Sequence, residues 1–206
     1  MEQSLFSLSR YLQAPSEFPY QAELGDPEVL RTLLRFLSLW NDPMPMQWRC
    51  IKKAAHIIVE KKVMQPFAVH LIREKKPQAY MKDCGEIYFS TGALTIRSSV
   101  VTLSVFCHEL AHMWLSQQDF YPALKSFDKQ FKTQFSAHPS VYLMSPIELY
   151  AMMIAIGMMR EVASFCPQKS KRHQKLCDLI EDECEKVKTL THEISMLPCD
   201  YHETES

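Results

Sequence analysis

Glycine is scarce in this 206-residue chain, which contains four glycines and 12 prolines. So few glycines exclude collagen-like and glycine-rich disordered proteins, and the sequence contains neither a dinucleotide fingerprint nor a phosphate-binding loop. An excess of charge is also lacking, because 23 Lys and Arg stand against 24 Asp and Glu. A dedicated nucleic-acid binder carries a clear basic excess, so this balance argues against nucleic acid as a partner. Hydrophobic residues make up 47% of the chain, which favours a globular fold over disorder.

Long apolar runs and a secretory signal are lacking as well. The most apolar segments, residues 100–107 and 149–159, are shorter than the stretch of about 20 residues that crosses a bilayer. Residues 1–6 lack the basic start of a signal peptide. We therefore expect no membrane association. The seven cysteines include no CxxC pair, which predicts free, mostly buried thiols and a cytoplasmic location.

The length and the hydrophobic pattern predict one domain over residues 1–206 with an α+β fold. Residues 1–62 are expected to form an N-terminal helical segment whose first 24 residues are irregular. Residues 63–165 are expected to form the core, and residues 166–206 a C-terminal helix and tail. Alternating or β-rich stretches predict strands over 67–72 and 84–89, and residues 93–96 follow a turn at Gly92. Helical periodicity predicts helices over about 27–40, 46–62, 98–117, 122–135, 146–164 and 169–192.

The most informative stretch is His108-Glu109-Leu110-Ala111-His112, an HExxH motif within a predicted helix. Four residues along a helix advance about 6 Å and return to nearly the same side, so both imidazoles can bind one ion. Glu109 points to the neighbouring side and can reach a water on that ion, which is the position of a general base. The helix is apolar on nearly every side and should be buried. Histidines satisfied within a core are the simpler alternative, but two buried imidazoles and a carboxylate need partners, which a metal with its water supplies.

A catalytic zinc ion takes three protein ligands and keeps the fourth position for water. Glu148 is the best third ligand, 36 residues after His112, on a predicted helix where small residues would allow close approach to the HExxH helix. The competing interpretation is a capping box, in which Glu148 would fold back onto the backbone of Ser145. His138 is the alternative third ligand, 26 residues after His112 in a predicted loop.

An HExxH motif followed by Glu148-x-x-Ala151 on a later helix resembles the gluzincin metallopeptidases. Residues 85–115 are similar to the minimal members of that group, in which a Gly-x-Ile-Tyr strand precedes a helix ending in HELAH. The later helix is similar to that of the ImmA/IrrE-type regulatory peptidases. SprT-like peptidases share the strand and the HExxH helix, but they place a third histidine in a nearer motif that this chain lacks. The resemblance implies a zincin-like fold with a small mixed or antiparallel sheet, flanking helices, bound Zn²⁺, and Glu109 as the catalytic base.

The resulting hypothesis is a zinc-dependent metallopeptidase that hydrolyses peptide or protein substrates with a zinc-activated water. A hydrogen-bond donor is expected beside the oxyanion, and Tyr142, Tyr150 and His138 are the candidates. Either residues 86–90 or residues 93–96 are expected to form the sheet edge that pairs with an extended substrate.

The alternative function is a non-catalytic zincin-like module that binds zinc or a partner protein. The intact Glu109 favours the enzyme, because a binding module has no need of a base beside its metal. A DNA-associated protease that uses the basic cluster at residues 169–175 is a third possibility. Such a cluster is more simply explained as the solvated end of a helix.

Overall fold

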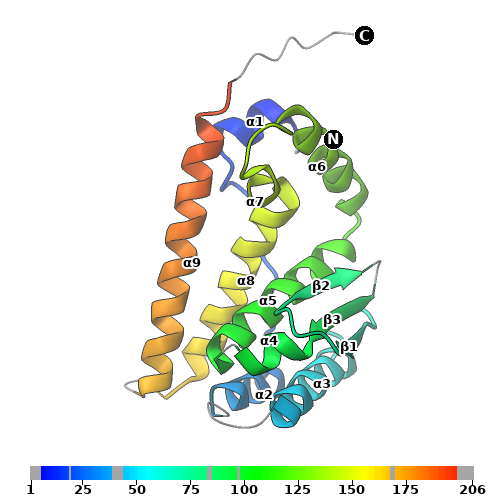
Figure 1. Cartoon of the computed structure of the whole chain (residues 1–206), viewed down its shortest axis with the longest axis vertical. Helices are drawn as coiled ribbons and strands as arrows, with labels where there is room; N and C mark the ends of the chain where they lie inside the picture. Colours follow the sequence, from blue (N-terminus) through cyan, green and yellow to red (C-terminus); the bar gives the residue numbers. More distant parts are fainter. Residues whose placement is uncertain are drawn as a thin grey trace.

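The computed structural model describes residues 6–18, 20–38, 44–82, 85–96, 98–167 and 170–198. Figure 1 shows a mostly helical structure with one small sheet at the side of the helices, which confirms the predicted α+β class. The helices are α1 (Leu8–Gln13), α2 (Pro27–Ser38), α3 (Met44–Glu60), α4 (Thr91–Ile96), α5 (Ser99–Ser116), α6 (Tyr121–Gln134), α7 (Val141–Met144), α8 (Pro146–Phe165) and α9 (Lys171–Ser195). The strands are β1 (Ala68–Ile72), β2 (Ala79–Lys82) and β3 (Glu86–Ser90).

The three strands form a mixed sheet in the order β1-β3-β2. β1 runs parallel to β3 and β2 runs antiparallel to it, so that His70, Tyr88 and Tyr80 lie side by side across the sheet. On the opposite face, Ile87 and Phe89 point into the core and are fully buried. The expectation that residues 86–90 form the sheet edge is therefore wrong. β2, which the sequence pattern did not predict, occupies the edge beside α5.

The other expected edge, residues 93–96, lies within helix α4 instead. The sequence analysis expected Gly92 to mark a turn before an extended segment, because glycine is a strong turn signal. The hydroxyl of buried Ser90 accepts a hydrogen bond from the Ala93 backbone amide at 3.0 Å, as an N-cap residue does. A side chain at Gly92 would clash with the backbone carbonyl of Lys75, so only glycine fits where the chain before β2 crosses the start of α4.

The first part of the chain is more ordered than its sequence indicates. Residues 1–24 were expected to be irregular, but Leu8–Gln13 form α1, whose first turn is capped by the Ser7 hydroxyl. The Tyr11 hydroxyl is buried and donates to the carbonyl of Met144 at 2.6 Å. The Tyr11 ring contacts the rings of Phe127, Phe131 and Tyr150 edge-on, so α1 is packed into the core of the protein.

Helices α5 and α8 lie side by side at the centre of the molecule, and α9 packs along the other side of α8 (Figure 1). Both central helices are buried on nearly all sides, as their apolar composition predicts. Within the described ranges, no helix is both long and apolar enough to cross a membrane. Among the cysteines that the structure describes, Cys107 and Cys166 are buried, whereas Cys50, Cys177 and Cys184 are only partly buried, so the expectation of mostly buried thiols is met only in part.

Candidate metal centre

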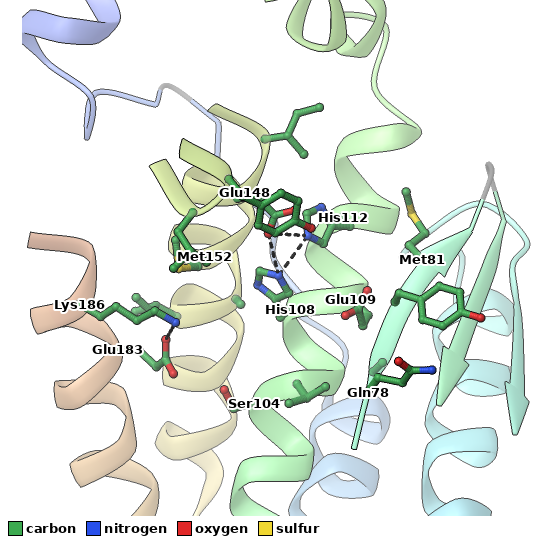
Figure 2. A pocket seen from close by; sticks show the side chains of 18 of the residues that line it. Gln78, Met81, Ser104, His108, Glu109, His112, Glu148, Met152, Glu183 and Lys186 are labelled. Atoms are coloured by element: carbon green, nitrogen blue, oxygen red, sulfur yellow. Dashed lines mark hydrogen bonds and ion pairs between the residues drawn. The ribbon is translucent and has the colours of Figure 1, made fainter. Parts of the chain in front are cut away.

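The two histidines of the HExxH motif and Glu148 come together between α5 and α8, as Figure 2 shows. The Nε2 atoms of His108 and His112 are 3.0 Å apart, and Oε2 of Glu148 is 3.5 Å from each of them. The side chains of His112 and Glu148 are about nine-tenths buried, with 11% and 10% exposed, and that of His108 is 27% exposed. Within the part of the chain that the structure describes, these three residues form a group that could hold a metal ion.

Glu148 is free to face the histidines because another residue caps its helix. Oδ1 of Asp128 accepts a hydrogen bond from the Ile147 amide at 3.1 Å, and its Oδ2 lies 2.8 Å from Nζ of Lys132. The Ser145 side chain makes no capping hydrogen bond at the start of α8. The capping box suggested by Ser145-x-x-Glu148 therefore does not form, and an orphan amide of α8 is satisfied from α6 instead.

The two carboxylates of the centre have opposite electrostatic environments. Burial alone would raise the pKa of Glu148, but hydrogen bonds from His108, His112 and Tyr142 outweigh it and hold that pKa well below its usual range. Burial raises the pKa of Glu109 to about 7; the charge of Glu148 adds to this rise, while His108 and a hydrogen bond from the Met81 backbone oppose it. Glu148 is therefore a permanent anion suited to a cation, whereas Glu109 can exchange a proton near neutral pH.

A cleft of about 600 Å³ opens in front of these residues. The side chains and backbone of residues 77–81, in and before β2, form one wall, and α9 contributes to the opposite wall (Figure 2). Along β2, the Ser90 amide donates to the carbonyl of Gln78. Because backbone bonding alternates along an antiparallel pair, the backbone groups of Ala79 and Met81 point away from β3, towards the free edge of the sheet. The backbone amide of Met81 donates a hydrogen bond to Glu109, which shows that it points away from β3.

The structure separates the three candidates for an oxyanion donor. Tyr142 of α7 lines the cleft, is 59% exposed, and hydrogen-bonds to Glu148 through its hydroxyl. Tyr150 is buried on the other side of α8, where its ring stacks on Phe18 with the centroids 4.1 Å apart. His138 lies between α6 and α7 and accepts the Ser140 amide on its Nδ1 at 3.2 Å. Tyr142 alone among these three belongs to the lining of the cleft.

Sequence reasoning missed the contribution of α9 to the cleft. Glu183 and Lys186 of this helix line it, whereas the described residues of the basic cluster 169–175 do not. The sequence contains a signal of this contribution: apolar residues recur every three or four positions along α9, and Glu183 occupies one of these positions.

Comparison of the chain with protein-family models, with curated protein sequences and with solved structures gives no significant match. An interpretation of function therefore depends on the chemistry of the centre itself. What the structure brings together is a buried His-His-Glu group that could hold a metal ion, with a second carboxyl group beside it and an open cleft in front.

Proposed function

We propose that this protein is a zinc-dependent metallopeptidase with a zincin-like fold, in which Glu109 acts as the general base. The observation that carries the proposal is the triangle formed by His108, His112 and Glu148, with Glu109 next to it at the floor of an open cleft. Peptides or proteins are the proposed substrates.

The spacing of the three ligand atoms supports zinc. Ligands at 2.0–2.1 Å from a tetrahedral zinc ion lie about 3.3 Å from one another, and the three separations here are 3.0, 3.5 and 3.5 Å. Two imidazoles and one carboxylate are also a ligand set of catalytic zinc sites, which keep one position for water. When bound, zinc would acidify that water and polarise the substrate carbonyl.

Glu109 is suited to move the proton. Its buried carboxyl group lines the cleft, and a hydrogen bond from the Met81 backbone fixes its orientation. With a pKa of about 7, Glu109 can take a proton from the attacking water and pass it to the leaving amine as the carbon–nitrogen bond breaks. Partial desolvation of the hydroxyl, its hydrogen bond to Glu148 and the charge of that carboxylate raise the pKa of Tyr142 above its ordinary value, so the hydroxyl stays protonated. It can donate to the developing oxyanion when it turns away from Glu148.

The edge of the sheet offers a way to bind an extended peptide. The outward backbone groups of Ala79 and the outward carbonyl of Met81 can pair with a substrate strand, which provides affinity independent of the substrate side chains. The Met81 amide is already engaged by Glu109. Because β2 forms one wall of the cleft and contacts α5, a peptide paired with it would lie across the metal centre.

The direct test is Glu109→Gln. The metal-free protein is reconstituted with zinc, its metal content is measured, and hydrolysis of unstructured peptides is followed by mass spectrometry. We expect the wild type to bind one zinc and cleave, and the variant to bind the same zinc with hydrolysis reduced at least about 100-fold, since it lacks the base. Full activity in the variant would contradict the role of Glu109. Stoichiometric zinc in a wild type without hydrolysis would instead support a non-catalytic module.

A further inference from the structure

The packed face of α9 carries a residue that its pattern does not explain. Apolar side chains follow one another at alternating spacings of four and three residues, which is the pattern of a helix packed along its whole length. Glu183 occupies the one position of this stripe that is not apolar, and its side chain is only 27% exposed. The stripe consists of Leu176, Ile180, Glu183, Val187, Leu190 and Ile194. A carboxylate that is largely buried in an apolar stripe lowers the stability of the fold. Its presence there indicates that Glu183 has a role other than packing.

Glu183 lies where α9 borders the cleft, and it has a lysine beside it. Nζ of Lys186 is 3.8 Å from Oε2 of Glu183, and the side chain of Lys186 is 47% exposed. Figure 2 shows the pair projecting from α9 towards the cleft. Within the described part of the chain, Lys186 is the one lysine or arginine among the residues that line the cleft.

An apolar path connects the metal centre with this pair. After Glu148, one side of α8 presents Met152, Ala155, Ile156 and Met159 to the cleft. Their spacing keeps them on one face of the helix, so the path leads from the metal ligand along α8. A substrate segment lying along it would contact methionine and aliphatic side chains first and the ammonium group of Lys186 next.

We propose that Lys186 is a specificity-determining residue that binds a carboxylate of the peptide substrate, and that Glu183 positions it. This inference rests on the proposed peptidase function. The carboxylate belongs either to an acidic side chain or to the C-terminus of the substrate. Because 3.8 Å is longer than an N–H···O hydrogen bond, the ammonium is steered by Glu183 without giving up its donors to it.

A matched control is available on the same helix. Lys188 forms the same kind of pair with Glu185, three residues before it, at 3.0 Å, but both side chains are at least 70% exposed and neither lines the cleft. Lys186→Glu and Lys188→Glu therefore make the same change of charge on α9, and they differ in whether that change faces the cleft. Lys186→Arg keeps the charge and serves as the conservative variant.

The experiment uses the full-length protein with zinc and synthetic decapeptides. A single Glu or Gln occupies each position in turn, and each peptide is made with a free C-terminus and with an amide. We expect kcat/KM to be about fivefold higher for the peptide with the correctly placed carboxylate than for its neutral counterpart, mainly through KM. Lys186→Glu should abolish or reverse this preference, and Glu183→Gln should weaken it through KM with kcat unchanged, whereas Lys186→Arg and Lys188→Glu should retain it. The Glu/Gln pairs and the acid/amide pairs distinguish the two sources of the carboxylate.

Binding separates failure of the subsite from failure of the proposed function. The same peptides, carrying a fluorescent label, are titrated with the zinc-loaded Glu109→Gln protein, with and without Lys186→Glu. A carboxylate preference that Lys186→Glu removes would support the subsite even where the wild type cleaves no peptide. The proposed subsite is overturned if the carboxylate and neutral peptides bind equally or not at all. It is also overturned if the preference for the carboxylate persists in Lys186→Glu.

Discussion

Glu148 reaches the two histidines from another helix, and its role can be isolated by one substitution. We predict that Glu148→Ala weakens zinc affinity by about 100-fold or more, because removing a ligand should cost at least as much as removing the residues that orient ligands. The measurement is a competition titration with a chromophoric chelator.

His138→Ala is the control for that titration. His138 bonds to the Ser140 amide, away from the centre, so its replacement should leave zinc affinity unchanged. An affinity that falls with His138→Ala and persists with Glu148→Ala would mean that the third ligand is wrongly assigned.

Site residues that lie within one helix turn of each other could be predicted from the sequence. Site residues that come together only through the packing of separate helices could be predicted less well. His108, Glu109 and His112 are placed by the geometry of a single helix turn. Nothing local distinguishes Tyr142 from Tyr150, because the difference arises from which side of the α7–α8 segment faces the cleft. Lys186 was missed for the same reason, since α9 reaches the cleft only through its packing on α8.

Among the elements, the start of α8 makes the clearest prediction. Asp128→Ala removes the side chain that accepts the Ile147 amide, one residue before the proposed ligand. We expect the free energy of unfolding to fall by about 1–2 kcal/mol, the usual effect of losing a helix cap. We also expect zinc affinity to decrease, because the first turn of α8 carries Glu148. Denaturant unfolding and zinc titration measure the two effects.

Asp128→Asn provides the comparison for this experiment. Asparagine keeps the oxygen that accepts the Ile147 amide and loses the charge opposite Lys132, an ion pair that is only partly buried. We expect a smaller loss of stability for this variant than for Asp128→Ala. Equal losses would attribute the effect to the charge rather than to the cap.

Long helices with a continuous apolar pattern were predictable, and short elements were not. α5 and α8 carry strong signals over 18 and 20 residues. β2 contains four residues whose strand conformation depends on pairing with β3, a relation that its own sequence does not encode. α4 is capped by the Ser90 hydroxyl of the preceding strand, a contact that the turn signal at Gly92 does not reveal, so an extended segment was expected there.

For the whole molecule, the proposed centre predicts that zinc stabilises the folded state. An ion that binds the folded protein and not the unfolded chain adds about 2.7 kcal/mol to the free energy of unfolding when its free concentration is 100 times its Kd. In a chain of this length, 1 kcal/mol corresponds to about 2–4 °C, so Tm should rise by about 5–10 °C. Differential scanning calorimetry of the metal-free protein, with zinc added, measures this rise.

Two variants test whether the rise comes from the centre. His112→Ala removes a ligand and should lose most of the zinc-dependent increase in Tm. Glu109→Gln leaves the three ligands in place and should keep it. An increase of the same size in His112→Ala would locate the stabilising zinc elsewhere.

The hydrogen bond from Tyr11 to the carbonyl of Met144 has a consequence for how the centre is maintained. Met144 lies two residues before the start of α8, the helix that carries Glu148. The hydrogen bond from Tyr11 therefore ties α1 to the segment that leads into α8. α1 is linked along the chain to α2 by the segment between Gln13 and Pro27. A cut in that connection leaves α1 attached only by packing and hydrogen bonding, so we expect the start of α8 to loosen and metal affinity to fall while every proposed ligand stays chemically intact.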